Sequence, residues 1–170
     1  MGRSVVVLTA AAALSGCAAG SGREGVSAPA AGGVIGISVG PCFGFCPVYE
    51  VRVRADGLIV FDGERHTAVI GERRRSAGPE TYRTLADDLA PFQPAPGTEG
   101  VVACDAAISD TSSYTITWID AAARRSVATH RIGCTGGPGH ALDQVLRDLP
   151  TRLGLGDWAS QVTRPGASRG

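Results

Sequence analysis

Five cysteines have the widest chemical range of any residues in this 170-residue chain, and their positions separate one from the other four. Cys17 follows a short apolar run near the N-terminus, whereas Cys42, Cys46, Cys104 and Cys134 lie further along. A cysteine thiol can be acylated, oxidised to a disulfide, or deprotonated to bind a soft metal ion. An even number remains once Cys17 is set aside, which is typical of a disulfide-bonded exported protein.

The residues before Cys17 have the features of an export signal. Arg3 precedes an apolar run over residues 5–14, which is too short to span a bilayer as a helix. The run ends in Leu-Ser-Gly-Cys, which resembles the lipobox of bacterial lipoproteins. This resemblance implies a signal peptide over residues 1–16 and acyl chains such as palmitate on Cys17. Because Ala18 rather than Asp follows, similarity to Gram-negative sorting patterns implies the periplasmic face of the outer membrane.

Composition limits the partners that we expect. Lys+Arg and Asp+Glu are equal at 16 each, so no basic field exists to attract nucleic acid. Residues 17–33 are mostly Ala, Gly, Ser and Pro and are expected to form a flexible tether. We predict one folded domain over residues 34–160 and a disordered tail over residues 161–170. No second apolar stretch of about 18 residues indicates a transmembrane helix.

The elements that must position the cysteines follow from hydrophobic periodicity. Alternation predicts strands, which cover residues 34–39, 49–54, 58–61, 66–73, 114–118 and 126–132. A helical period predicts two helices: one opens at Pro79 and ends before Pro91, and the other carries a leucine stripe from Leu142 to Leu153. Residues 91–112 are expected to be a loop. The order β-meander, helix, hairpin, helix favours a two-layer α+β fold, with two helices on one face of an antiparallel sheet.

The segment from Pro41 to Tyr49, PCFGFCPVY, is the sharpest local signature. It resembles a family of uncharacterised bacterial lipoproteins, a domain-of-unknown-function family marked by PCFGxCPxY. The resemblance runs from about Val34 to Trp158 and includes a later cysteine pair flanking a hairpin. It implies a fold unit and a compartment, but no activity.

Four cysteines allow three disulfide pairings. Cys42 and Cys46 are close enough in sequence for their Cα atoms to reach bonding distance across a tight loop. Cys104 and Cys134 bracket the hairpin over residues 114–132, so we favour these two local pairs. The longer loop would be worth roughly 3–4 kcal/mol of stability.

Copper or redox chemistry is the alternative for Cys42 and Cys46. The motif CxxxCP followed by a distant histidine, here His130, resembles the copper site of periplasmic copper chaperones for cytochrome oxidase. Those proteins place the motif before a helix, whereas here Pro47 leads into a predicted strand. A four-cysteine zinc site is less favoured because its usual CxxC pairs are missing.

The remaining polar candidates form no recognisable catalytic motif. The three histidines are His66, His130 and His140, and the loop serines are Ser109, Ser112 and Ser113. Asp105 and Asp110 could act as an acid–base pair, although aspartates in loops are usually turn formers. We therefore predict no catalytic residues, no metal and no cofactor.

Two further patterns could bind anions. The glycine-rich run over residues 133–139 could hold an anion on free amides, but it lacks the ending of a phosphate loop. Arg73, Arg74 and Arg75, with Arg52 and Arg54, could form a basic stripe on one sheet face. The sequence thus predicts a non-enzymatic lipoprotein that binds or scaffolds an envelope protein or polymer; a thiol-based copper or redox protein is the alternative.

Overall fold

The computed structural model describes residue 2 and residues 32–162 of the chain. The expected signal peptide, the lipidated Cys17 and almost all of the expected tether lie outside the described residues, as do residues 163–170 of the tail. Among the described helices, none is long and apolar enough to cross a membrane.

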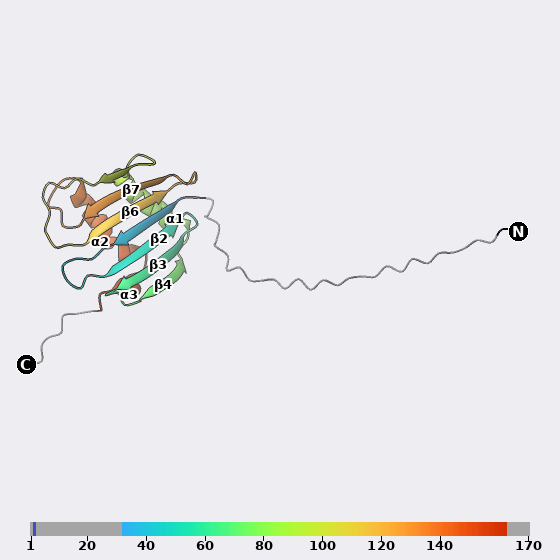
Figure 1. Ribbon diagram of the computed structural model, residues 1–170, viewed down its shortest axis with the longest axis horizontal. Helices are drawn as coiled ribbons and strands as arrows, with labels where there is room; N and C mark the ends of the chain where they lie inside the picture. The colour runs from blue at the N-terminus through green and yellow to red at the C-terminus, as the bar shows by residue number, and fades with distance from the viewer. Residues whose placement is uncertain (1, 3–31, 163–170) are drawn as a thin grey trace, which may run out of the picture.

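A seven-stranded open sheet carries two main helices, which is the α+β class expected from the sequence. The strands are β1 (Val34–Val39), β2 (Val48–Arg54), β3 (Leu58–Arg65), β4 (Gly71–Ser76), β5 (Glu99–Val101), β6 (Ser113–Ile119) and β7 (Arg125–Arg131). The helices are α1 (Pro79–Leu89), the 3-10 turn η1 (Ala90–Phe92), α2 (Pro138–Arg152) and α3 (Gly156–Ala159). The strand order is β4-β3-β2-β1-β6-β7-β5, with β1 at the centre (Figure 1).

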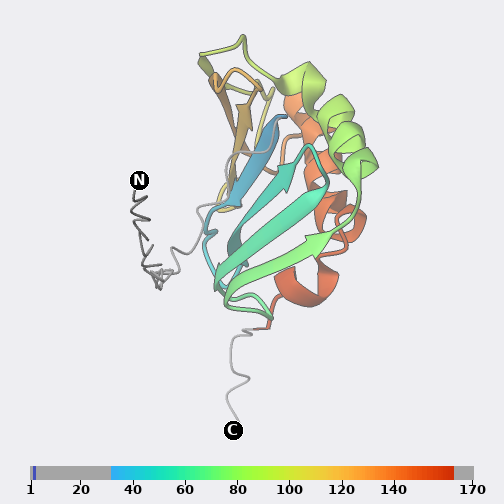
Figure 2. The same ribbon diagram turned by 90° about the vertical axis from the view of Figure 1, so that its right-hand side faces the viewer.

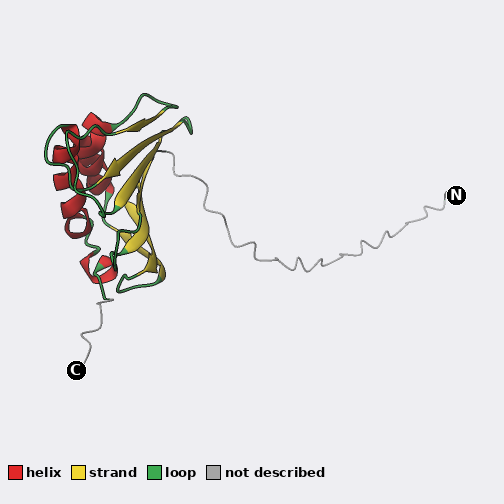
Figure 3. Ribbon diagram, turned by 60° about the vertical axis from the view of Figure 1, so that its left-hand side comes forward, coloured by secondary structure: helices red, strands yellow, loops and turns green. Residues whose placement is uncertain are grey.

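The sheet has one covered and one open face. Figures 2 and 3 show α1 and α2 lying together on the same side of the strands. Alternate residues of the central strand, such as Ile35 and Ile37, are fully buried beneath these helices, because successive side chains of a strand point to opposite faces. Leu89 of α1 and Leu142 and Leu146 of α2 supply the helix side of the same core.

Local sequence signals explain both helices. Pro79 occupies the first turn of α1 and Pro138 that of α2, where a missing N–H costs nothing. The glycines before them, Gly78 and Gly137, have φ angles of 77° and 72°. These left-handed conformations suit glycine and turn the chain into each helix.

The fourth strand differs from its predicted position. We expected residues 66–73, but β4 is Gly71–Ser76 and β3 extends to Arg65. His66 has a φ of 61°, which is outside the extended range of strand residues with a side chain, and Thr67 Oγ1 donates to the Val69 carbonyl at 2.7 Å. Residues 66–70 therefore form a connection, and the apolar residues in it made the segment look like a strand.

Besides the 3-10 turn η1, two short elements were not predicted. β5 lies in the expected loop and pairs in parallel with β7, so the sheet is not wholly antiparallel. The short helix α3 follows α2 and places Trp158 against Phe61, with ring centroids 5.9 Å apart. Neither element is long enough for a hydrophobic period to be visible in the sequence.

Candidate functional site

Two disulfides lie at the end of the sheet where β1 ends and β2 begins. Bonds join Cys42 to Cys46 and Cys104 to Cys134, with Cα atoms 5.7 Å and 5.6 Å apart. These are the two local pairs favoured on sequence grounds. We call the surface formed by residues 40–47, 64–70, 102–112 and 132–137 the stapled end.

The Cys42–Cys46 ring is a compact five-residue loop. Gly44 has a φ of 144° and its N–H donates to the Cys42 carbonyl at 3.0 Å. The Phe43 N–H donates to the Asp110 carbonyl at 3.2 Å, which ties the ring to the loop before β6. β2 begins at Val48, so Pro47 is the only residue between the ring and a strand, as the sequence context predicted.

The Cys104–Cys134 bond joins two segments that lie side by side. The Thr135 N–H donates to the Ala106 carbonyl at 2.9 Å, and the Ile108 N–H donates to the Gly133 carbonyl at 3.0 Å. The long loop before β6 is therefore linked to the loop after β7 by backbone hydrogen bonds as well as by the disulfide.

A buried hydrogen-bonded network lies beneath this second disulfide. Asp143 of α2 is fully buried, and its Oδ1 lies 2.6 Å from Nε2 of His130, whose side chain is only 1% exposed. Asp143 Oδ2 accepts hydrogen bonds from the N–H groups of Gly133 at 2.7 Å and Cys134 at 2.9 Å. The Arg147 guanidinium, one turn along α2, donates to the same oxygen at 3.2 Å. The carboxylate is thus fully satisfied by protein groups, which is what allows a charge to be buried.

Two tyrosines lie in line with His130 across the strands, on the face of the sheet that the helices cover. Tyr114 of β6 is directly opposite His130, and Tyr49 of β2 lies two strands further along, across Val39. Burial raises the pKa of Tyr49, and burial followed by the charge of Asp143 raises the pKa of Tyr114. Both phenols therefore stay neutral to a higher pH than an exposed tyrosine would.

Three potential ligand atoms meet in this network. One atom each of His130, Cys134 and Asp143 lies within 4.8 Å of the others. Cys134 is bonded to Cys104, so its thiolate becomes a ligand only if that disulfide is reduced. The copper motif paired His130 with Cys42 and Cys46, but the structure places the imidazole beside Cys134. The histidine next to the Cys42–Cys46 disulfide loop is His66. Its imidazole centroid is 5.3 Å from the centroid of the Phe45 side chain.

The other polar residues considered as candidates each contact different groups. His140 Nδ1 lies 2.9 Å from the Cys134 carbonyl oxygen, and Ser109 Oγ donates to its neighbour Asp110 at 3.3 Å. The Asp105 N–H donates to the Gly136 carbonyl at 3.3 Å, which ties Asp105 to the loop after β7. Ser112 is buried and Ser113 opens β6. Within the described residues, the serines, histidines and aspartates form no nucleophile–base array.

The structure changes the interpretation of both predicted anion sites. The glycine-rich loop does bind a carboxylate on its amides, but the carboxylate belongs to Asp143 of the chain itself. The arginine run is divided because strand residues alternate: Arg74 shares the open face with Arg52, whereas Arg73 and Arg75 point to the other face. Glu72 lies 2.6 Å from Arg74 and 3.9 Å from Arg52, so the stripe on the open face is largely neutralised.

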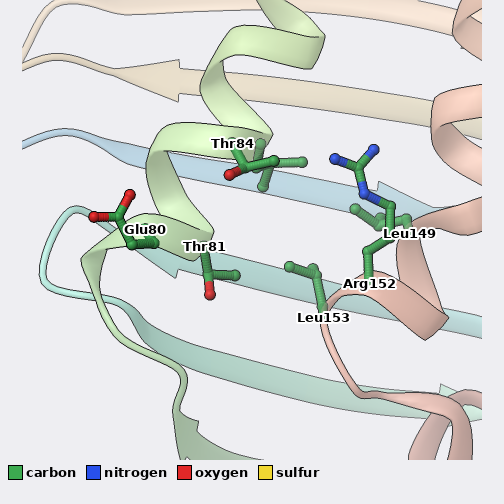
Figure 4. A pocket seen from close by; sticks show the side chains of 7 residues that line it. Glu80, Thr81, Thr84, Leu149, Arg152 and Leu153 are labelled. Atoms are coloured by element: carbon green, nitrogen blue, oxygen red, sulfur yellow. The ribbon is translucent and has the colours of Figure 1, made fainter.

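Two surface hollows accompany these residues. A groove of about 200 Å³ lies between α1 and α2, with Glu80 on the α1 side and Leu149, Arg152 and Leu153 on the α2 side (Figure 4). A larger hollow of about 600 Å³ lies on the open face beside the stapled end. We call it the open-face hollow; its lining includes Val39, Gly40, Pro41, Val48, Gly63, Glu64, Arg65, Ile70 and Gly71.

Asp143 is the central residue that sequence reasoning missed. A weak signal was present, because Asp143 lies three residues before Leu146 and directly after Leu142, on the buried side of a predicted amphipathic helix. A charged residue at such a position needs a buried partner. The sequence did not identify that partner, because His130 belongs to a different element.

Comparison with known proteins identifies the domain but no activity. A family model described as a domain of unknown function, DUF6438, matches residues 33–151. The match covers most of the described residues and confirms the expectation of a domain of unknown function. A search of curated proteins found no match.

Proposed function

The chain belongs to the domain of unknown function family DUF6438, and from that premise we propose that it is a lipid-anchored lipoprotein facing the periplasm. In this proposal acyl chains on Cys17 hold it to the outer membrane. The folded domain binds or scaffolds another envelope component and catalyses no reaction. Its partners are the bilayer, through Cys17, and an envelope protein or polymer.

One observation carries the proposal: all four cysteines of the described domain are joined as two disulfides at the same end of the sheet. Disulfides persist in oxidising compartments such as the periplasm, and they are rare in the cytosol. The pattern therefore agrees with the export signal expected over residues 1–16.

The position of the disulfides supports a binding role. The proposed tether enters the domain at Val34, and β1 runs from there to Val39, so the stapled end is at the far end of the central strand. A domain anchored through Cys17 would present that end to the periplasm. Cross-linked loops lose little conformational freedom on binding, which favours affinity.

Charge supports a partner other than nucleic acid. The chain has 16 basic and 16 acidic residues, and Arg52 and Arg74 on the open face are both paired with Glu72. An acidic polymer would therefore have to displace Glu72 from Arg74 before it could bind there. A protein or a neutral polymer meets no such competition.

Metabolic labelling with a radioactive or clickable palmitate analogue tests the anchor. The wild-type chain and the Cys42→Ser/Cys46→Ser variant should both incorporate the label and fractionate with the outer membrane. The Cys17→Ser variant should incorporate none. Label on Cys17→Ser, or wild-type protein without label, would contradict the anchoring proposal. Alkylation of the unreduced protein should find no free thiol among the other four cysteines.

A thiol-based copper or redox function, the alternative reading of Cys42 and Cys46, is the second candidate. The cluster of His130, Cys134 and Asp143 favours it, although at the other cysteine pair. Mild dithiol reduction followed by alkylation and copper titration separates the two functions. Ready reduction with stoichiometric copper uptake supports the second candidate, and resistance to reduction supports the first.

A further inference from the structure

The two cysteines of the second disulfide differ in exposure. Cys134 is only 4% exposed, whereas Cys104 is partly exposed and residues 105–110 after it are exposed. Cys42 and Cys46, which form the first disulfide, are both partly exposed. Thiol–disulfide exchange begins when a thiolate attacks one of the two bonded sulfurs, and access decides which sulfur is attacked. The second disulfide therefore presents one sulfur to an incoming thiolate and shields the other.

The shielded cysteine lies where a departing thiolate is stabilised. Cys134 Sγ packs against the first turn of α2, since a Cβ on Gly139 would lie only 2.6 Å from it. The amino end of a helix favours a thiolate through its dipole. A ring nitrogen of His130 is within 4.8 Å of the same sulfur, so an imidazole adjoins the position where the thiolate forms. These contacts make Cys134 the better leaving group of the two, because a thiol that is stabilised as a thiolate leaves faster.

The charged groups around Cys134 offset one another. A carboxylate oxygen of Asp143 is also within 4.8 Å of the sulfur, but this carboxylate already accepts the N–H groups of Gly133 and Cys134. The Arg147 guanidinium lies 3.2 Å from Asp143 Oδ2, so the unlike charges of these two side chains largely cancel. The carboxylate therefore opposes the formation of a thiolate on Cys134 much less than an unpaired carboxylate would.

We propose that Cys104 and Cys134 form a thiol-exchange site, in which a thiolate from another molecule attacks Cys104 Sγ and expels Cys134. An S–S bond forms between the incoming sulfur and Cys104, the Cys104–Cys134 bond breaks, and its electron pair stays on Cys134 Sγ. The incoming sulfur is thereby oxidised and Cys134 is reduced, so the chain ends in a mixed disulfide with the other molecule. The proposal goes beyond the proposed function, whose thiol alternative uses Cys42 and Cys46 and whose anchor is Cys17.

Backbone hydrogen bonds keep Cys134 in position to reverse the step. Its N–H donates to Asp143 Oδ2 at 2.9 Å, and the Thr135 N–H donates to the Ala106 carbonyl at 2.9 Å. Neither bond depends on the disulfide, so both hold the freed thiolate beside Cys104. Attack by Cys134 on the mixed disulfide then restores the original bond and releases the other molecule as its thiolate. The site therefore binds a thiol covalently and reversibly.

Trapping of the mixed disulfide in the full chain, held in detergent, tests the direction of attack. The protein is treated with an excess of 2-mercaptoethanol, a neutral thiol that Asp105 beside Cys104 does not repel. Acid then stops the exchange, and free thiols are alkylated with a maleimide. Trypsin separates Cys104 from Cys134 because it cleaves after Arg124 and Arg131. We expect mercaptoethanol on Cys104 with the alkyl group on Cys134, in at least about tenfold excess over the reverse arrangement.

The first disulfide is the matched control in the same digest. Cys42 and Cys46 are both partly exposed, so the mercaptoethanol adduct should appear on both of them. A second arm replaces 2-mercaptoethanol by an uncharged peptide that carries one cysteine, because a partner thiol can belong to a protein or to a small molecule. An adduct on Cys104 in both arms supports the proposal for protein thiols, and an adduct in the first arm alone supports it for small thiols.

Two single variants measure access to each sulfur separately. Cys134→Ser leaves Cys104 as a free thiol and Cys104→Ser leaves Cys134, while both variants lose the same bond. Reaction with an aromatic disulfide reagent should be at least about tenfold faster for Cys134→Ser. Adducts mainly on Cys134, equal adducts on both cysteines, no adduct on either, or equal rates in the two folded variants would overturn the proposal. If guanidinium titration shows that one variant is unfolded, the adduct ratio of the wild-type chain decides.

Discussion

Asp143 Oδ1 lies 2.6 Å from His130 Nε2, and the two side chains are 0% and 1% exposed. The pair joins α2 to β7. Because the second carboxylate oxygen accepts the amides of Gly133 and Cys134, the same residue also fixes the loop that carries the second disulfide. Asp143 therefore links the helix, the sheet and the stapled end.

Replacement of Asp143 by Asn should destabilise the domain strongly. The variant keeps the size of the side chain but removes a carboxylate that His130 and Arg147 contact, and it turns an amide NH2 towards donors. Loss of one partner of a buried pair costs roughly 3–5 kcal/mol. Urea denaturation measures the change. Asp148→Asn, an exposed site on the same helix, should change stability by less than about 0.5 kcal/mol; equal effects at both positions would contradict the role given to the buried pair.

The two disulfides should contribute unequally. Cys104–Cys134 closes a separation of 30 residues and Cys42–Cys46 a separation of four. A disulfide stabilises a protein mainly because it restricts the unfolded chain. On this basis the free energy of unfolding should fall by about 4 kcal/mol in the Cys104→Ser/Cys134→Ser variant and by about 2 kcal/mol in Cys42→Ser/Cys46→Ser. Free energies of unfolding from guanidinium titrations test this order. A larger loss from the short ring would show that native contacts, and not loop closure, govern its contribution.

Most of the fold could be predicted because its elements have strong, regular patterns. The alternation in β1, β2, β6 and β7 and the leucine stripe of α2 each extend far enough to define a period. The prediction failed at residues 66–70, where apolar side chains pack in an irregular connection. It also missed β5, whose pairing with β7 depends on contacts between segments distant in sequence.

The candidate site was predictable only in part, for a related reason. The cysteine pairs could be chosen from their spacing and from the hairpin between Cys104 and Cys134. The partner of His130 could not, because Asp143 is 13 residues away and reaches the imidazole only after α2 packs on the sheet. The glycine-rich loop was correctly seen as a source of free amides, but the anion they bind is internal.

Stability should fall in alkaline solution because Tyr49 must ionise inside the core. Burial raises its pKa above the ordinary value of 10.0, so the stability it contributes is fully present below about pH 10 and is lost as the pH rises further. Tyr49→Phe should therefore flatten the decline in unfolding free energy above about pH 10. Tyr82→Phe is the control, because that residue is less buried. Parallel curves for wild type and Tyr49→Phe would contradict this assignment.

The start of α2 should tolerate no added methyl group at Gly139. A Cβ there would lie 2.6 Å from Cys134 Sγ, 2.9 Å from His130 Cε1 and 3.0 Å from the Ala103 carbonyl oxygen, all closer than normal contact. Gly139→Ala must push the helix away from the disulfide and the imidazole, and overpacking of this kind costs about 1–3 kcal/mol. Gly156→Ala, at the start of α3, meets no atom within 4 Å and should be neutral or stabilising by up to about 1 kcal/mol. Thermal unfolding of the two variants measures the contrast, and a Gly139→Ala protein as stable as wild type would mean that α2 is not held against the second disulfide as closely as this packing requires.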